Sequence, residues 1–200
     1  MACYWARFER KGSEYFRYDT RVYLEDVDTV ERQDACIGAV VGKNPGSARP
    51  TNPSGSVIQP IDLANYKLLP NIQSIVSKAY SHRQIQMPSR AYVQILNLFY
   101  LCDADLSSGL DKLKHLAGNF CDTESREFPW VWYVWGDNDP RLSELKLRFH
   151  NLRSRRHLFY DPSQSQIRTH CPRPEEFARH TQGLRHDLVV PALASCIEGR

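Results

Sequence analysis

The amino-acid sequence predicts an α/β fold with three layers (α/β/α), in which helices cover both faces of a central, mostly parallel four-stranded sheet. Short apolar runs alternate along the chain with longer segments whose apolar residues recur at helical spacing. Two of the runs end directly in a glycine, as strands that stop at a tight loop often do. The four expected strands are 35–41, 92–101, 130–135 and 157–160.

Helices are expected between and after these strands. Segments 61–79 and 105–120 each carry a stripe of apolar residues at helical spacing. A third helix is expected from Pro140 to about residue 152, because proline suits the first turn of a helix. A last helix is expected to run from Pro174 toward residue 196, with Pro191 as a kink.

The N-terminal region is polar and aromatic. Alternation in residues 15–18 and 21–24 suggests a hairpin or edge strands, so residues 1–34 are taken as an N-terminal extension. Residues 43–60 form a long loop with four prolines. One domain, 1–196, is the simplest organisation, and 197–200 resemble a protease-cleavage linker that is left out of the argument.

Composition narrows the class of protein. The chain of 200 residues has a net charge of +3 and is long enough for one domain with a real core. No apolar run approaches the roughly 20 residues that span a bilayer, and the N-terminus lacks the apolar core of a signal peptide. We therefore expect a cytoplasmic protein without a membrane partner. Six scattered cysteines without a C-x-x-C pair predict reduced thiols and no structural zinc.

The charge is unevenly distributed. Residues 141–186 carry ten Arg or Lys against four Asp or Glu, a local +6, so the remainder carries −3. Five of the seven histidines also lie in this segment. Such a basic region suggests an anionic partner such as nucleic acid, although a solvated helix surface explains part of it. The run 153–156 is harder to explain as a helix surface, because it falls where a helix ends and a strand begins.

The loop after the first strand is the most informative stretch. Gly42 and Gly46 can take backbone angles that other residues avoid, and Pro45 pushes Asn44 toward an extended conformation. The loop is therefore stiff and holds one amide side chain in a set direction. It suits the positioning of a water or the binding of an anion through N–H groups, or it is an ordinary turn.

Candidate site residues follow from the expected parallel sheet, because the carboxyl ends of its strands share one edge. Asn44, Asn97, Trp135-Gly136 and the loop 169–174 with His170 would meet there. An amide can read the edge of a nucleobase, and a histidine can donate to an oxygen that gains negative charge. The alternatives are that Asn97 is a satisfied core amide, that Trp135-Gly136 is strand-end packing and that His170 only holds its own loop.

Other polar residues receive more ordinary assignments. Asp103 and Asp105 are expected to cap the helix that begins near Leu106, and Asp103 also remains a candidate general base. The remaining histidines of the basic segment are expected on the surface or on the basic face: His150, His157, His180 and His186.

The order of these motifs resembles the uracil-DNA glycosylase superfamily. The matching segments are Gly42-Lys43-Asn44-Pro45-Gly46, Ile95-Leu96-Asn97-Leu98, Val134-Trp135-Gly136 and His170-Cys171-Pro172-Arg173-Pro174. The chain resembles more closely a bacterial and phage family of unknown function related to these enzymes, which shares the Phe16-Arg17-Tyr18 type of opening. Four short motifs within residues 15–190 carry the resemblance, which implies a uracil-DNA-glycosylase-like fold.

The resemblance also implies a mechanism for a monofunctional DNA glycosylase that needs no metal or cofactor. We expect the protein to be a monomer. Asn44 would position the attacking water, and His170 would stabilise the departing base. Asn97 would hydrogen-bond the flipped base, with Phe99, Tyr100 or Tyr66 stacked on it. Loop contacts would come from Gly42, Lys43, Pro45, Gly46 and Ser47, and DNA phosphates would be held by Arg49, Arg173, Arg155 and Arg156.

Two departures from the family pattern shape the expected substrate. Cys171 is interposed in the His-Pro loop, and the first loop has no acidic residue to activate water strongly. The implied substrate is a damaged or modified base, such as a modified base of invading phage DNA. The open alternatives are a non-catalytic module that binds nucleic acid or nucleotides, and an N-glycosidase that acts on a small nucleotide. A catalytic contribution of Asp103 or Asp137 is also left open.

Overall fold

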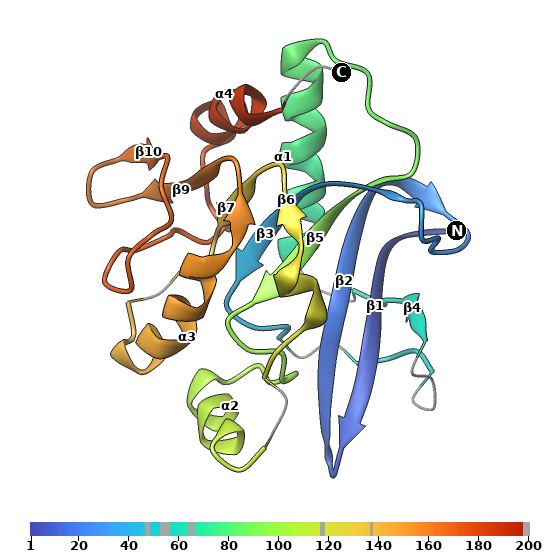
Figure 1. Ribbon diagram of the computed structural model, residues 1–200, viewed down its shortest axis with the longest axis vertical. Coiled ribbons are helices and arrows are strands. Elements are labelled where there is room, and N and C mark those ends of the chain that lie inside the picture. The colour runs from blue at the N-terminus through green and yellow to red at the C-terminus, as the bar shows by residue number, and fades with distance from the viewer. Residues whose placement is uncertain (47–48, 53–56, 64–66, 117–118, 137, 198–200) are drawn as a thin grey trace.

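A computed structural model describes residues 1–46, 49–52, 57–63, 67–116, 119–136 and 138–197 (Figure 1). Eight of its strands form one mixed sheet in the spatial order β10-β9-β7-β3-β5-β2-β1-β4. The strands of this sheet are β1 (Ala2–Lys11), β2 (Glu14–Val27), β3 (Ala35–Gly42), β4 (Ile58–Pro60), β5 (Ala91–Asn97), β7 (Val131–Tyr133), β9 (His157–Asp161) and β10 (Gln166–Arg168). Two short strands, β6 (Glu127–Phe128) and β8 (Arg153–Ser154), form a separate parallel pair.

The four strands expected from the sequence are the parallel part of the sheet. β3 pairs in parallel with both β5 and β7, and β7 pairs in parallel with β9. Their apolar runs suit this place, because central parallel strands are buried on both faces. The expectation of a four-stranded sheet is nevertheless wrong, since four antiparallel strands extend it on both sides to eight.

The N-terminal strands contribute most of that extension. β1 and β2 form an antiparallel hairpin, and β2 also pairs antiparallel with β5. The hairpin was expected, but β2 is not an edge strand, because it lies between β1 and β5. Figure 1 shows the hairpin projecting beyond the neighbouring strands at its tip. On the outer sides, β4 pairs with β1 and β10 pairs with β9.

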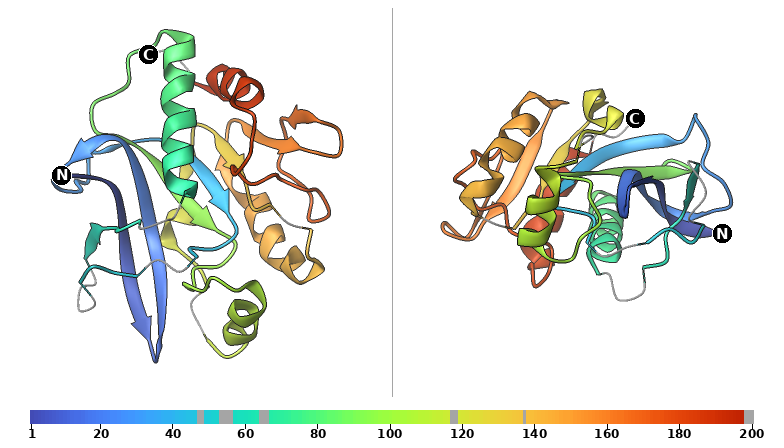
Figure 2. Two further views of the ribbon diagram at one scale, coloured as in Figure 1. Left: turned by 180° about the vertical axis from the view of Figure 1, so that it is seen from behind. Right: turned by 90° about the horizontal axis from the view of Figure 1, so that it is seen from below.

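Helices cover both faces of the sheet, as two separate hydrophobic clusters show. α1 (Leu68–Arg83) and α4 (His186–Cys196) contribute to one cluster, and Figure 2 shows both in front of the sheet when it is seen from behind. α2 (Leu106–Leu113) and α3 (Ser143–Leu147) pack on the other. The 3₁₀ helices are η1 (Asp122–Ser125), η2 (Pro140–Leu142) and η3 (Arg148–Asn151).

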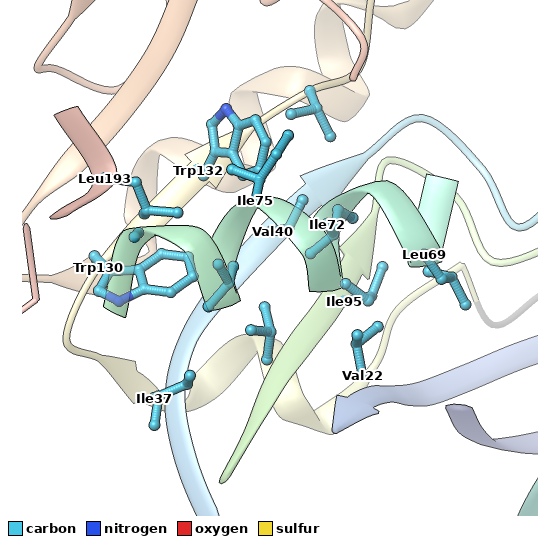
Figure 3. Packing of buried hydrophobic residues seen from close by; sticks show 14 of the residues in the cluster. Val22, Ile37, Val40, Leu69, Ile72, Ile75, Ile95, Trp130, Trp132 and Leu193 are labelled. Carbon is cyan, nitrogen blue, oxygen red and sulfur yellow. The ribbon is translucent and has the colours of Figure 1, made fainter. Parts of the chain in front are cut away.

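On the face of the sheet that α1 covers, side chains pack directly against the strands. Figure 3 shows Ile72 and Ile75 of α1 beside Val40 of β3, with Trp130 alongside. A Cβ on Gly38 would lie only 2.2 Å from the Trp130 ring. Glycine at this position therefore lets the indole pack directly on the backbone of β3.

All four expected helices differ from the observed ones. In place of the expected helical segment 61–79, α1 begins at Leu68 and ends at Arg83. The expected helix 105–120 ends at Leu113, because the chain returns to the sheet, where Asn119 Oδ1 accepts the N–H of Tyr100. The segment from Pro140 to residue 152 is α3 between two 3₁₀ helices rather than one helix. The last helix begins at His186 and not at Pro174, since residues 170–176 form a loop closed by Glu176.

Two negative findings concern only the part of the chain with described placement. No helix there is long and apolar enough to cross a membrane. The same ranges contain no group of three or more His, Cys, Asp or Glu side chains that could hold a metal ion.

Candidate functional site

The parallel strands create a natural ligand position at their carboxyl edge. After β3 the chain passes through α1 to β5 on one side of β3, and after β5 it passes to β7 on the other side. Such a reversal of strand order opens a crevice outside the carboxyl ends of the strands, where ligands bind in open α/β sheets. Gly42, Asn97 and Trp135 stand at the ends of these three strands.

Asn97 is the most unusual residue at this edge. Its side chain is 0% exposed, and neither its Oδ1 nor its Nδ2 has a hydrogen-bond partner in the described structure. A Cβ on Gly42 would lie 3.2 Å from Asn97 Oδ1, so glycine leaves room beside the amide. A buried amide without partners costs about 1–3 kcal/mol. Asn97 is therefore not an amide that other described protein groups satisfy.

Asn44 joins the loop after β3 to the chain after β5. Its Nδ2 donates to the backbone carbonyl of Asp103 at 2.6 Å. Two backbone bonds reinforce this connection, because Leu98 N–H donates to Gly42 and Phe99 N–H donates to Lys43. Pro45 is buried and Gly46 has a φ of +67°. The loop 42–46 is thus held against β5, and the amide nitrogen of Asn44 is used in holding it.

Asp103 has a structural role beside this loop. Its carboxylate accepts hydrogen bonds from Lys112, Ser108 and the N–H of Asp105. Burial raises the pKa of Asp103, but these donors outweigh it and hold the pKa below its ordinary value. A carboxylate engaged in this way is a weak general base. The expected capping is confirmed for Asp105, which accepts the Ser108 N–H at the N-cap of α2.

The aromatic residues expected to stack on a base are already packed against protein. Phe99 and Tyr100 are both 0% exposed. The Phe99 ring lies 3.3 Å from the position of a Cβ on Gly109 of α2, and Tyr100 donates its hydroxyl to Glu124 at 2.7 Å. Neither ring presents an open face. The other candidates, Tyr66, Ser47 and Asp137, lie outside the described residues.

His170 is bound within its own loop. Its Nε2 lies 3.1 Å from Glu176, and its ring meets Phe159 edge-on at 5.3 Å between centroids. Glu176 also accepts the N–H of Arg173 at 2.7 Å. Burial raises the pKa of Glu176, but the hydrogen bonds from Arg173 and His170 lower it overall. These contacts match the alternative in which His170 stabilises its loop, and none joins it to Asn44 or Asn97.

A different histidine, His180, lies at the end of β7. Gly136 has a φ of +65°, and a Cβ on it would lie 2.8 Å from the Cβ of His180. The N–H of Gly136 also donates to Ala178 at 2.7 Å. Gly136 therefore admits the segment 178–180 to the strand end. The sequence assigned His180 to the surface or the basic face, and only the glycine after Trp135 could have signalled this close approach.

The surroundings of His180 favour its neutral form. Burial first, and then the positive charge of Lys43, lower the pKa of His180. The N–H of Gln182 donates to His180 Nδ1 at 3.2 Å. A neutral ring that accepts at Nδ1 carries its proton on Nε2. His180 can therefore donate one hydrogen bond from Nε2.

The expected phosphate-binding arginines do not lie together. Arg155 and Arg156 precede β9, and Arg155 lines a cavity with Ala35 and Trp130, at the amino ends of β3 and β7. We call this the amino-edge cavity. Arg156 also donates to the Ser195 carbonyl. Arg49 is elsewhere, donating to the Cys102 carbonyl beyond the carboxyl end of β5.

Much of the basic segment 141–186 is neutralised locally. Ion pairs join Arg141 to Asp139, Arg148 to Glu124, Arg168 to Asp161 and Arg185 to Asp187. Lys146 is 0% exposed and lies over the Trp135 ring. The excess of positive charge in the sequence therefore overstates the free charge offered to a polyanion.

Comparison with known proteins adds no assignment. No family model matches the chain, and neither the curated proteins nor the solved structures include a significantly similar one.

Proposed function

We propose that the protein is a DNA glycosylase that hydrolyses the N-glycosidic bond of a damaged or modified base flipped out of the double helix. The observation that carries this proposal is the buried, unpartnered amide of Asn97 at the topological switch point. We further propose that the parallel strands β5-β3-β7-β9 form a uracil-DNA-glycosylase-like core. The order of the motifs along the strand ends supports this.

Asn97 would read the base. Its amide presents a donor and an acceptor side by side, as the hydrogen-bonding edge of a pyrimidine or purine does. A flipped base would give both atoms a partner and remove the desolvation penalty that they carry now. The site would thus bind a base more strongly than it binds water, because the base satisfies both groups at once.

Asn44 and His180 would serve the chemical step. The Nδ2 of Asn44 holds the loop, which leaves its Oδ1 to orient a water toward the sugar carbon. His180, in place of His170, would donate from Nε2 to the oxygen of the departing base as that oxygen gains negative charge. A neutral imidazole can serve this role because its Nε2–H donates while its Nδ1 accepts the N–H of Gln182.

The substrate class follows from the chemistry of the loop. Residues 42–46 contain no acidic side chain, so water activation is weak and a base that departs readily is favoured. A modified base of phage DNA, excised in host defence, fits this requirement. We propose that the protein acts on DNA as a monomer in the cytoplasm, with Arg49, Lys43 and Arg173 near the phosphates.

A second candidate is a nucleotide N-glycosidase that uses the same site. The local pairing of the basic segment favours it, because a small substrate needs fewer free cations than a DNA duplex. Salt distinguishes the two, since DNA binding weakens steeply with salt concentration and the hydrolysis of a nucleotide need not.

The decisive experiment measures released bases. Duplexes with uracil, damaged bases or phage-type modified cytosines, and a panel of modified genomic DNAs, are incubated with the protein. Free base is detected by mass spectrometry, and abasic sites are revealed with alkali. The Asn97→Leu variant serves as the control, because leucine fills the space of the asparagine side chain but lacks its amide group. Tight DNA binding without release of any base would favour a non-catalytic binding module instead.

A further inference from the structure

The backbone that carries Asn97 is held by two different parts of the chain. The N–H groups of Leu98 and Phe99 donate to carbonyls of the loop after β3, at 3.0 and 3.2 Å. Arg148 Nη2 donates to the carbonyl of Asn97 at 3.2 Å and to that of Leu98 at 2.9 Å. The two peptide groups that follow Asn97 are thus each held at the N–H and at the carbonyl.

Arg148 binds this backbone where its pairing with β2 is interrupted. β2 pairs with β5 as far as Ile95, and an isolated bridge joins β2 to the chain again at Leu101. The carbonyls of Asn97 and Leu98 lie between these two points. Arg148, the first residue of η3, therefore gives them the donor that a neighbouring strand gives elsewhere in a sheet.

A buried carboxylate orients the guanidinium of Arg148. The Nε of Arg148 lies 2.9 Å from Glu124 Oε2, and the Glu124 side chain is only 6% exposed. The other oxygen of Glu124 accepts the hydroxyl of Tyr100 at 2.7 Å and the N–H of Cys121 at 3.3 Å. Because a guanidinium is rigid and planar, fixing its Nε also fixes the direction of Nη2. Glu124 thus holds Arg148 in the orientation that reaches both carbonyls.

The side chain of Asn97 depends on this support. Neither of its polar atoms has a hydrogen-bond partner among the residues with described placement, so no hydrogen bond of its own sets the direction of the amide. That direction follows from packing and from the backbone that Arg148 holds. A buried ion pair adds little net stability compared with apolar residues, so a gain in stability alone is a weak reason for Arg148 and Glu124 to lie here.

We propose that Arg148, oriented by Glu124, is a positioning residue that fixes the Asn97 amide in the direction in which it would read a base. This inference rests on the proposed function, because Asn97 is the residue that would contact the base. Arg148 would touch neither the base nor a phosphate, and it would act only through the backbone of Asn97. One arginine of the basic segment would thus serve the site without binding the DNA.

Base release by Arg148→Lys tests this proposal. Lysine keeps the charge, but its single ammonium cannot serve both carbonyls and Glu124 together. We expect kcat/KM to fall at least about tenfold, because a small misplacement of a substrate-binding group is costly, and the salt dependence of DNA binding to stay unchanged. Full activity of Arg148→Lys would overturn the proposal.

Arg168→Lys is the matched control. Arg168 belongs to β10, at the outer edge of the sheet, and its Nε lies 3.5 Å from the carboxylate of Asp161, which is 8% exposed. The substitution therefore disturbs a similar ion pair far along the sheet from β5. It should leave base release unchanged. An equal loss of activity in both lysine variants would contradict a specific role of Arg148.

A double-mutant cycle separates positioning from a general loss of stability. Because Asn97→Leu already lacks the amide, adding Arg148→Lys should reduce base release no further, while both backgrounds should lose the same free energy of unfolding. Glu124→Gln is a second variant, since glutamine accepts the Tyr100 hydroxyl but has no charge to hold Arg148. It should lose less activity than Arg148→Lys, and only where Asn97 is present. Additive losses of activity would overturn the proposal.

The side-chain amide of Asn97 also gives a readout that needs no turnover. Its nitrogen–proton NMR signals are the pair that is missing from the spectrum of Asn97→Leu. We expect this pair to shift and broaden in Arg148→Lys and to stay unchanged in Arg168→Lys. A displaced amide in a protein that releases no base would refute the glycosylase and leave the positioning role standing. Base release by the wild type with an undisturbed amide in Arg148→Lys would overturn the positioning role alone.

Discussion

The two ends of the parallel strands differ in what they offer a ligand. The amino edge has the amino-edge cavity, of about 880 Å³, with Tyr80, Met87 and Trp130 among its lining residues. The carboxyl edge has the unpartnered amide of Asn97 and the loop 42–46. The cavity and the unpartnered amide thus lie at opposite ends of the parallel strands. The proposed site therefore rests on the chemistry of its side chains and not on a hollow in the surface.

Two glycines of β3 show the same difference between the amino edge and the carboxyl edge. Gly38, near the amino edge, is covered by the Trp130 ring, and a Cβ there would overlap it at 2.2 Å. Gly42, at the carboxyl edge, has only looser neighbours, of which the nearest is Asn97 Oδ1 at 3.2 Å. One glycine serves packing, and the other leaves space beside a polar group. Their substitutions should therefore fail in different ways.

The largest effect is expected for Gly38→Ala. The added methyl group overlaps several atoms of a fully buried indole, so the free energy of unfolding should fall by at least about 3 kcal/mol. Urea unfolding measures it. Gly109→Ala in α2 is the control, where the nearest atom lies at 3.3 Å and alanine favours the helix, so stability should change little. Equal losses in both variants would show that the packing of Trp130 is not special.

Asn97→Leu should separate function from stability. Base release should fall about 10–100-fold in kcat/KM, the loss expected for hydrogen bonds worth about 1.5–3 kcal/mol. The free energy of unfolding should rise by about 1 kcal/mol, because two unpartnered polar atoms leave the core. The two predictions are checked by measuring kcat/KM for base release and urea unfolding on the same preparation of the variant. A less stable variant with full activity would make Asn97 a structural residue.

Gly136→Ala tests the approach of His180 to the carboxyl edge. Both a φ of +65° and a contact at 2.8 Å oppose a side chain, so we expect a loss of about 2–3 kcal/mol in stability and a displaced His180. Gly183→Ala is the control, because its φ is +68° but its nearest atom lies at 3.9 Å. It should lose only about 1 kcal/mol. If the two variants lose the same amount, backbone strain alone explains both.

His180 should also influence the pH dependence of stability. Its pKa in the folded state is lowered, so the unfolded chain binds more protons near pH 6 and acid favours unfolding. Stability should therefore fall as the pH drops below about 6.5, with one histidine contributing at most about 1.4 kcal/mol per pH unit. His180→Asn should reduce the slope of Tm against pH. An unchanged slope in His180→Asn would contradict this assignment.

The smallest effect is expected at the amino edge. Arg155→Ala removes an exposed charge beside the amino-edge cavity and should change DNA affinity less than twofold. Lys43→Ala, at the carboxyl edge, should weaken DNA binding several-fold and reduce its salt dependence by about one phosphate contact. Fluorescence anisotropy at several salt concentrations measures both. A larger loss of DNA affinity in Arg155→Ala than in Lys43→Ala would indicate that DNA binds at the amino edge of the parallel strands.

Local patterns in the sequence were enough to predict the parallel core of the sheet and to select Asn97 as the main candidate site residue. Apolar runs located β3, β5, β7 and β9, and Asp105 was recognised as a helix cap. Asn97 stood out as an amide in an apolar strand. These features are local, because burial periodicity and capping depend on neighbours a few residues away.

Which side chains and strands meet depends on tertiary packing. The place of β2 between β1 and β5, the ion pairs that neutralise the basic segment, and the closure of the His170 loop by Glu176 all join residues that no periodicity connects. His180 reaches the carboxyl edge only because Gly136 lacks a side chain. Such contacts depend on how separate elements pack, and a one-dimensional pattern does not encode them residue by residue.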